Sequence, residues 1–225
     1  MEIQKIVLCK IKGEQAFEVD DVVAIEASYQ VFINGSIAFS FTCTPRDVEE
    51  MVIGTLFSRR YIQAAAQIKD MKISTSEIFV TLQDRNEAHN YESYSKPSLD
   101  ATTMFETVNA IFNNPDTLFN RTGCAHCCAL MRNNKILCTF EDIGRHNALD
   151  KVIGHALLSG IPMNDCVIFT SGRIPGDYME KIIHAGFPVA VSRSAVTDEA
   201  IRLAIEHNVT LYGFVRGNSA NLYNP

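Results

Sequence analysis

The C-terminal part of the sequence alternates short apolar segments with amphipathic segments. Three apolar segments, at 165–170, 188–192 and 210–215, have the length and composition of buried strands. Between them, residues 178–185 and 197–207 repeat apolar side chains at helical spacing. Connections of strand, helix and strand favour parallel strands within one sheet. The sequence therefore predicts an α/β fold.

Segment 140–151 (FEDIGRHNALDK) concentrates charged and polar side chains around Gly144. A strand is predicted directly before it, at 135–140, and a helix after the bend, at 147–158. The junction of a strand and a helix is where α/β proteins place ligand-binding groups. The segment is therefore predicted to be a functional site. The alternative is a hydrogen-bonded strand–helix corner that is held by an Arg–Asp ion pair.

Four successive predicted strands end in side chains of similar chemistry. In a parallel sheet these ends lie at one edge, where ligands bind. Arginine suits phosphate, and Gly and Ser let backbone N–H groups approach an anion, although a surface salt bridge is the alternative for any single Arg. We therefore predict a pocket for a phosphorylated ligand, with Arg145, Arg173 and Arg216 converging on one cavity. The sequence contains no GxGxxG and no Walker loop. The four strand ends are Arg145-His146, Ser171-Gly172-Arg173, Ser192-Arg193-Ser194 and Arg216-Gly217-Asn218.

The first hundred residues are rich in predicted strands. Segments 22–25, 29–33 and 37–41 have strand-like composition, and Asn34-Gly35 is a strong hairpin turn between the last two. Two further short strands fit within 68–82. This part of the chain is predicted to be a β-rich α+β domain.

A helix and a long loop complete this first part. Thr44 is predicted as the N-cap of the helix and Pro45 as its first residue. Residues 84–100 are polar and show no apolar period, so we predict a surface loop and a domain boundary there. The predicted domains are 1–100, which includes this loop, and 101–225, which forms the α/β domain.

Composition and charge exclude several classes of protein. Of the 225 residues, 47% are hydrophobic and 20% are charged, as in soluble globular proteins. The net charge of −6 and the pI near 5.5 give no general attraction to nucleic acid or to acidic membranes. Neither a membrane-spanning apolar run nor a signal peptide is evident, so we expect a cytoplasmic protein without nucleic-acid or membrane partners. Seven scattered cysteines argue against a disulfide framework.

Three cysteines, Cys124, Cys127 and Cys128, lie close together with His126 between them. Three interpretations stay open. Zinc needs about four ligands, and this segment would supply three only with strained local geometry. A reactive thiol would need a lowered pKa, which a neighbouring Arg or a protonated His could provide. Alternatively, Cys127 and Cys128 begin a buried helix as small hydrophobic residues.

Five motifs occur in order along the chain. They are Thr122-Gly123 with His126, EDIGRHNALDK at 141–151, SGR at 171–173, SAVT at 194–197 and GFVRGN at 213–218. In order and spacing they resemble the formate dehydrogenase accessory sulfurtransferases, the FdhD family. Members of this family look like a cytidine-deaminase-like three-layer α/β domain preceded by a smaller β-rich α+β domain. They often form homodimers, and the resemblance implies the same architecture and assembly here.

The resemblance also implies a function. Family members accept sulfur from a cysteine desulfurase and pass it to the molybdenum or tungsten bis-guanine-dinucleotide cofactor of formate dehydrogenase. That ligand carries phosphates and guanines, which fits the anion pocket predicted from the strand ends. The family's cofactor-binding motif maps onto Phe214, Val215, Arg216, Gly217, Asn218 and Ser219.

The chain departs from the family pattern in its cysteines. The family carries a Cys-x-x-Cys in the polar loop, and one of those thiols holds the persulfide; the two positions here are Tyr91 and Tyr94. Conversely, Cys124 and the Cys127-Cys128 pair stand where the family usually has a second Gly and an Ala-Ala pair. The alternative function is therefore a cofactor-binding chaperone without sulfur transfer.

The candidate catalytic residues are Cys124, His126, His146 and Asp142. His146 and Asp142 are expected to shape or protonate the ligand. Cys124 is the best candidate for a persulfide, because it follows a Thr-Gly pair in a turn and we expect Arg145 near it. No structural metal is expected, and the competing deaminase-like hydrolase would need His-x-Glu and Pro-Cys-x-x-Cys, which are absent. The predicted cofactor-binding residues are Arg145, Ser171, Gly172, Arg173, Ser192 and Ser194, together with the six residues of the C-terminal motif.

Overall fold

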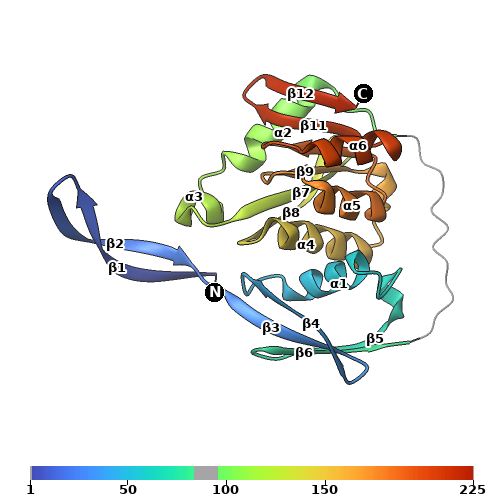
Figure 1. Ribbon diagram of the computed structural model, residues 1–225, viewed down its shortest axis with the longest axis horizontal. Coiled ribbons are helices and arrows are strands. Elements are labelled where there is room, and N and C mark those ends of the chain that lie inside the picture. The colour runs from blue at the N-terminus through green and yellow to red at the C-terminus, as the bar shows by residue number, and fades with distance from the viewer. Residues whose placement is uncertain (1, 84–95, 225) are drawn as a thin grey trace.

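A six-stranded mixed sheet forms the centre of the second half of the molecule (Figure 1). The computed structural model describes residues 2–83 and 96–224. The strands of this sheet are His126–Arg132 (β7), Lys135–Asp142 (β8), Val167–Thr170 (β9), Val189–Ser192 (β10), Thr210–Arg216 (β11) and Ser219–Asn224 (β12). They lie in the order β12-β11-β10-β9-β7-β8. Strands β9, β10 and β11 are parallel, whereas β7 and β12 are antiparallel to their neighbours.

The ends of four strands meet at one edge of this sheet. Because β7 is antiparallel to both β8 and β9, strand β8 runs in the same direction as β9, β10 and β11. Their carboxyl ends therefore lie together, beside the beginning of β7. The predicted parallel arrangement is confirmed for β9, β10 and β11, as is the predicted meeting of four strand ends, whereas the antiparallel directions of β7 and β12 were not predicted.

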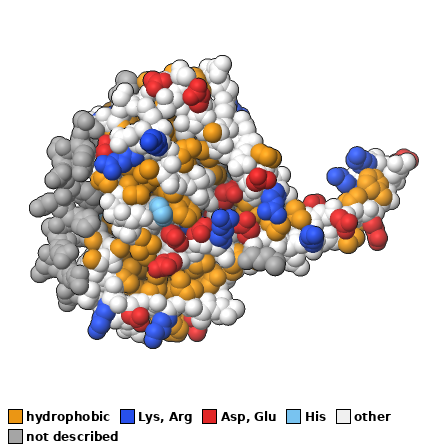
Figure 2. All heavy atoms as spheres, turned by 180° about the vertical axis from the view of Figure 1, so that it is seen from behind, with side chains coloured by type: hydrophobic (Ala, Val, Ile, Leu, Met, Phe, Trp, Pro, Cys, Tyr) orange, Lys and Arg blue, Asp and Glu red, His pale blue; other side chains and the backbone are white. Residues whose placement is uncertain are grey.

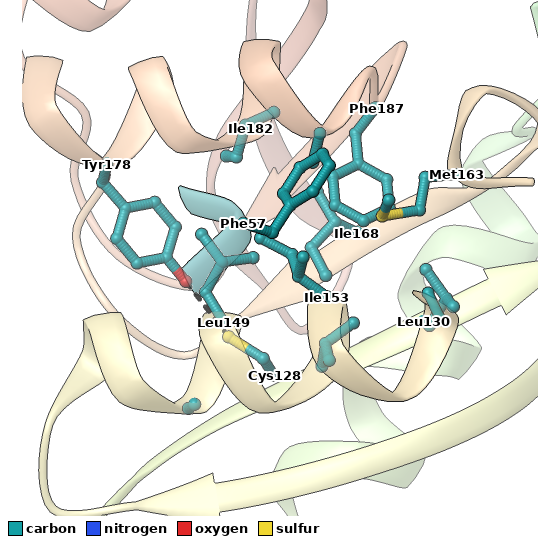
Figure 3. Packing of buried hydrophobic residues seen from close by; sticks show 14 of the residues in the cluster. Phe57, Cys128, Leu130, Leu149, Ile153, Met163, Ile168, Tyr178, Ile182 and Phe187 are labelled. Carbon is teal, nitrogen blue, oxygen red and sulfur yellow. Dashed lines mark hydrogen bonds between the residues drawn. The ribbon is translucent and has the colours of Figure 1, made fainter. Parts of the chain in front are cut away.

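Helices cover both faces of the sheet because apolar side chains alternate along its strands. On β7, Cys128 and Leu130 pack among helices α4, α5 and α6, whereas Ala129 and Met131 pack against α2. Figure 3 shows Leu130 among the side chains of the first cluster. The sheet is thus the middle of three layers. The helices of this half are Ala101–Phe112 (α2), Leu118–Thr122 (α3), Arg145–Leu158 (α4), Gly176–Ala185 (α5) and Asp198–Glu206 (α6), with a short 3-10 helix at Met163–Asp165 (η2).

A second sheet, of four strands, lies below the first in Figure 1 and carries helix α1. Its elements are Ala27–Ile33 (β3), Ser36–Cys43 (β4), Val48–Ser58 (α1), Ala65–Gln67 (η1, a 3-10 helix), Ile68–Ile73 (β5) and Glu77–Leu82 (β6), in the strand order β4-β3-β6-β5. The predicted turn is confirmed, since Asn34 and Gly35 have φ values of 49° and 83°. Most of the predicted loop at 84–100 lies outside the described residues, and the division into two domains stays a prediction.

Helices α1 and α4 cross at two glycines. A Cβ on Gly54 would collide with the backbone carbonyl of Asp150, and a Cβ on Gly154 with that of Glu50. One buried apolar cluster continues from the four-stranded sheet through this crossing into the six-stranded sheet. The crossing therefore fixes the N-terminal sheet against the strand–helix junction at the beginning of α4.

An extended hairpin precedes both sheets and projects from the body of the molecule (Figures 1 and 2). Its two strands are Ile3–Lys12 (β1) and Gln15–Ala24 (β2). Apolar side chains such as Val7 and Phe17 are exposed along it, among charges of both signs. Only its last residues were predicted as strand, because charged residues interrupt the apolar alternation elsewhere.

The start of α1 differs from the prediction. Asp47 occupies the N-cap position in a left-handed conformation, with φ of 53° and no side-chain cap. Thr44 instead donates its hydroxyl to Asp142 Oδ2 at 3.0 Å and accepts from Lys151 Nζ at 2.9 Å. The predicted roles of Thr44 as N-cap and Pro45 as first helical residue are therefore wrong, because a long-range polar network holds Thr44.

Candidate functional site

A cavity of about 360 Å³ opens where the strand ends meet, on the face of the six-stranded sheet that α2 covers. This volume lies within the range of small-molecule sites. Helices α2 and α3 supply apolar and aromatic side chains, and the strand ends supply polar ones. The lining residues are Ile111, Phe112, Thr117, Phe119, Ala125, His126, Cys127, Glu141, Ser171, Arg193, Ser194 and Arg216.

The period of two along the strands explains why three of the polar side chains line the cavity. The residues two positions before Ser171 and Arg193 belong to the apolar cluster beneath α2. Ser171 and Arg193 therefore continue the same face beyond the ends of β9 and β10. Glu141 lies opposite Cys127 in the β7–β8 ladder, and opposite residues of antiparallel strands share a face. Glu141, Ser171 and Arg193 thus extend the apolar face that α2 covers.

Arg193 and Arg216 form the cationic side of the cavity. Arg216 Nε donates to the backbone oxygen of Arg193 at 2.9 Å. The Arg193 guanidinium carbon lies 5.9 Å from the centre of the Phe112 ring, and its Nη1 donates to the Phe112 carbonyl at 3.4 Å. Among the described residues, neither arginine forms an ion pair. Their charges are therefore available to an anionic ligand.

Two serines at the end of β10 have different roles. Ser192 is fully buried, and its Oγ donates to the Gly172 carbonyl at 2.7 Å and accepts from Ser194 N at 2.9 Å. It ties the loop after β9 to the loop after β10 without lining the cavity. Ser194 does line the cavity. Of these two serines, both predicted to bind the cofactor, Ser194 is thus placed to contact a ligand and Ser192 to hold the loops.

His126, at the beginning of β7, also lines the cavity. Its Nδ1 lies 3.5 Å from Ser171 Oγ. Burial lowers the pKa of His126, and the charges of Arg145 and Arg173 lower it further, against the opposing effect of Asp142. The imidazole is therefore neutral at pH 7 and can exchange a proton with a bound ligand.

Arg145 and Arg173 do not line this cavity. Arg145 begins α4 and packs beside Gly172, where an added Cβ would approach Arg145 Cβ to 3.0 Å. Its Nε is buried without a hydrogen-bond partner among the described residues. Arg173 is exposed. The structure thus does not bring the three predicted arginines together in this cavity: Arg216 lines it, and the other two influence it through His126.

Asp142 is fully buried and forms a hydrogen-bonded centre beneath the site. Its Oδ1 accepts from Gly144 N at 2.9 Å and from Asn147 Nδ2 at 2.7 Å. Its Oδ2 accepts from the backbone and hydroxyl of Thr44 and pairs with Lys151 Nζ at 2.8 Å. These protein donors occupy both oxygens, so its placement supports shaping the site rather than exchanging a proton with a ligand.

His146 lies on the opposite side of the edge from the cavity. Its Nε2 is 3.4 Å from Asp177 Oδ2, and its ring meets that of Tyr178 edge-on, with 5.2 Å between ring centres. Burial lowers the pKa of His146, and the charge of Lys181 lowers it further. Its predicted catalytic role stays a prediction.

The three clustered cysteines differ in environment. Cys127 and Cys128 are buried in β7, so the interpretation that they begin a helix is wrong. Burial raises the pKa of the Cys128 thiol to about 11, and that of the Cys127 thiol well above its ordinary value. Figure 3 shows the contact between Cys128 Sγ and Tyr178 Oη, which are 3.1 Å apart. Cys124 is exposed and directly precedes Ala125, a lining residue.

The C-terminal motif forms the end of β11 and the turn into β12. Phe214 is exposed and has a φ of 51°, at an irregularity in the ladder between β11 and β12. Val215 is buried against α2, and Gly217 and Asn218 form an exposed turn before Ser219. Of these predicted cofactor-binding residues, Arg216 lines the cavity.

Several lining residues were not predicted. Arg193 lies within a predicted strand end, and the period of two along β10 could have assigned it to the cavity. Glu141 begins the EDIGRHNALDK motif at 141–151 (the central motif), and its position in β8 could have placed it in the cavity. No sequence pattern assigns the apolar lining residues Ile111, Phe112 and Phe119 to the cavity. Only tertiary packing brings α2 and α3 against the strand ends.

Neither metal ligands nor a membrane helix is found in the described parts of the chain. Within 2–83 and 96–224, no group of three or more His, Cys, Asp or Glu side chains is placed to hold a metal ion. His126 and Cys127, two of the zinc ligands considered above, are consecutive residues of one strand and point to opposite faces. None of the described helices is long and apolar enough to cross a membrane.

The fold and the cavity together define a three-layer α/β protein with a cationic, aromatic-walled ligand site at the carboxyl edge of its sheet. Comparison with known proteins identifies the family. The FdhD/NarQ family model matches residues 24–99 and 84–225, and the chain belongs to this family.

Three relatives illustrate the similarity. Protein FdhD of Methanocaldococcus jannaschii is 33% identical over 223 residues, which cover 98% of this chain and 96% of that protein. Sulfur carrier protein FdhD of Bacillus subtilis is 34% identical over 234 residues, covering 92% and 89%. The crystal structure of a formate dehydrogenase accessory protein from Desulfotalea psychrophila has a TM-score of 0.87 and 28% identity, covering 100% of this chain and 98% of that one.

Proposed function

We propose that this protein serves a formate dehydrogenase by binding the molybdenum or tungsten bis-guanine-dinucleotide cofactor in the cavity beneath α2 and by carrying sulfur to it. The names of the relatives, sulfur carrier protein and formate dehydrogenase accessory protein, support this general role. The observation that carries the proposal is the pairing of Arg193 and Arg216 beside aromatic walls, which suits phosphates next to a planar base.

Two further features fit an anionic ligand at this edge. Arg145 Nε is buried without a protein partner among the described residues, which is costly unless a ligand satisfies it. Gly172 lets the backbone after β9 approach Arg145, because an added Cβ would lie only 3.0 Å from Arg145 Cβ. The cationic edge therefore extends from the cavity around His126 to the first turn of α4.

Cys124 is the proposed sulfur carrier. It is exposed and adjoins the cavity through Ala125, whereas Cys127 and Cys128 are buried with raised pKa values. The Cys124 thiolate attacks the outer sulfur of a persulfide on a cysteine desulfurase. The donor S–S bond breaks, the donor cysteine leaves as thiolate, and Cys124 keeps the sulfur as a persulfide without any added oxidant. His126, next to the cavity, then donates or accepts the proton that accompanies delivery.

Binding without sulfur transfer is the second candidate function. It is favoured by Tyr91 and Tyr94, which stand where the family carries its loop thiols and lie outside the described residues. In this case Arg193 and Arg216 would hold the cofactor and Cys124 would have no role in transfer. The further features implied by the family resemblance, a cytidine-deaminase-like α/β domain, a homodimer and a cytoplasmic location, belong to the same proposal.

Sulfur loading tests the transfer step. The purified protein is incubated with a cysteine desulfurase and cysteine, and added sulfur is mapped by peptide mass spectrometry. We expect sulfur on Cys124 that disappears in Cys124→Ser and persists in Cys9→Ser, the matched control because Cys9 is also exposed. An unmodified protein that still binds guanine nucleotide would instead support the cofactor-binding chaperone.

A further inference from the structure

Glu141 is the single acidic side chain among the described lining residues of the cavity. Placed near the cationic side, a carboxylate opposes the binding of a phosphate. It favours binding only where it meets a part of the ligand that carries hydrogen-bond donors. A ligand with phosphates at one end and donors at the other satisfies both sides of the cavity.

The Glu141 carboxylate is held in place by the backbone of α3. Its Oε2 accepts from Leu118 N at 2.8 Å, and its Oε1 lies 3.4 Å from Phe119 N. It forms no ion pair with Arg193 or Arg216, and each carboxylate oxygen can accept about two hydrogen bonds. Acceptor capacity therefore remains on both oxygens, in an orientation that the protein has already fixed.

The surroundings of Glu141 suit a planar heterocycle. Phe119, whose backbone nitrogen faces the carboxylate, is 48% exposed as a residue and lines the cavity. Ile111 and Phe112 of α2 complete the apolar wall. An exposed aromatic ring beside an oriented carboxylate is a surface on which a base can stack while its edge is hydrogen-bonded.

We infer that Glu141 selects guanine, by accepting hydrogen bonds from its N1–H and its exocyclic amino group while the base stacks on Phe119. The phosphates then extend toward Arg193 and Arg216. Hypoxanthine lacks the exocyclic amino group and loses one of these two hydrogen bonds. Adenine has a ring acceptor in place of N1–H and no amino group at C2, so it loses both. This inference rests on the proposed function and names the residue that reads the base.

Nucleotide selectivity of the full chain tests the inference. Calorimetry compares GDP, IDP and ADP on the wild type, Glu141→Gln and Glu180→Gln, in which an exposed acid on α5 is changed instead. We expect the wild type and the control to bind GDP about 10- to 100-fold more tightly than IDP, the scale of a hydrogen bond to a charged group. In Glu141→Gln we expect this ratio to fall close to one.

The Glu141→Gln variant keeps a side-chain oxygen that can accept from Leu118 N. Its thermal unfolding reports whether α3 stays in place. If Glu141→Gln weakens GDP, IDP and ADP equally and leaves the ratio unchanged, Glu141 only holds α3 and the inference is overturned. Equal binding of all three nucleotides to the wild type would also overturn it, while leaving the proposed function intact. Absence of nucleotide binding to the wild type would overturn the proposed function itself, and the inference with it.

Discussion

Lys151 and Asp142 form an ion pair, with 2.8 Å between Nζ and Oδ2, in which neither side chain is exposed to solvent. Lys151 Nζ also donates to the Thr44 hydroxyl at 2.9 Å and to the Glu141 carbonyl at 3.1 Å. The pair thus joins the middle of α4 to the end of β8 and to the segment between β4 and α1. Residues of the central motif therefore hold the site together from beneath.

Breaking this pair should destabilise the protein strongly. Lys151→Met leaves the Asp142 carboxylate buried without its countercharge, and we expect the free energy of unfolding to fall by about 3–5 kcal/mol. Denaturant titration measures the change. Arg202→Ala, which removes exposed ion pairs to Glu199 and Glu206 on α6, is the control and should change stability little. A similarly small effect of Lys151→Met would contradict the structural role of the pair.

The α1–α4 crossing makes a separate prediction. In Gly54→Ala the new methyl group meets the backbone carbonyl of Asp150, which cannot move independently of α4. We expect a loss of about 1–3 kcal/mol in the free energy of unfolding, the scale of overpacking. In the control, Gly176→Ala, the close contact of the methyl group is with the flexible side chain of Glu199 and not with backbone. Equal stability of the two variants in denaturant titration would show that the crossing tolerates a larger residue.

Much of the fold could be predicted from local patterns. The alternation of apolar strands and amphipathic helices predicted the order β9-α5-β10-α6-β11, and Asn34-Gly35 predicted its hairpin. The predictions that failed concerned features that depend on contacts between residues far apart in the sequence. Nothing local shows that β7 inserts between β8 and β9 with reversed direction, or that Thr44 is held by Asp142 instead of capping α1.

The candidate site was predicted only in part, because its remaining residues are brought together by contacts between distant parts of the chain. Residues at strand ends identify an edge of the sheet, but the two sides of that edge follow from strand parity. By this parity Arg193 belongs to the α2 side, whereas Arg145 and His146 belong to the side of α4 and α5. Arg216 also lines the cavity, but it follows an irregularity in β11, so parity alone would not have placed it. The aromatic wall could not be predicted, because Phe112 and Phe119 of α2 and α3 belong to none of the motifs.

Thiol reactivity should separate the cysteines by environment. Cys124 is exposed, whereas Cys128 is buried with its pKa raised from 9.0 to about 11, which lowers its thiolate fraction about 100-fold near neutral pH. We expect iodoacetamide to modify Cys124 and the exposed Cys9 in the native protein, and Cys127 and Cys128 only after unfolding. Mass spectrometry of timed samples measures the rates. Early modification of Cys127 or Cys128 would contradict their burial.

Stability should fall on mild acidification. Burial lowers the pKa values of His126, His146 and His184 in the folded protein, whereas histidine in the unfolded chain has a pKa of about 6.5. Below that pH the unfolded state binds more protons, so the free energy of unfolding decreases as pH falls through 6.5 toward the folded values. Denaturant titrations at several pH values should show a shallower dependence in His126→Asn. The exposed His207→Asn serves as control, and an unchanged slope in His126→Asn would contradict the prediction.

Guanine nucleotide binding to the cavity is the central claim, and calorimetry with GDP tests it most directly. We expect wild-type protein to bind GDP, and Arg193→Ala and Arg216→Ala each to weaken binding by about 1–3 kcal/mol, the scale of a charge-assisted hydrogen bond. Arg173→Ala, on the exposed rim, should have a smaller effect, and Arg202→Ala on α6 none. GDP binding that is absent, or that survives the loss of both Arg193 and Arg216 unchanged, would contradict the account.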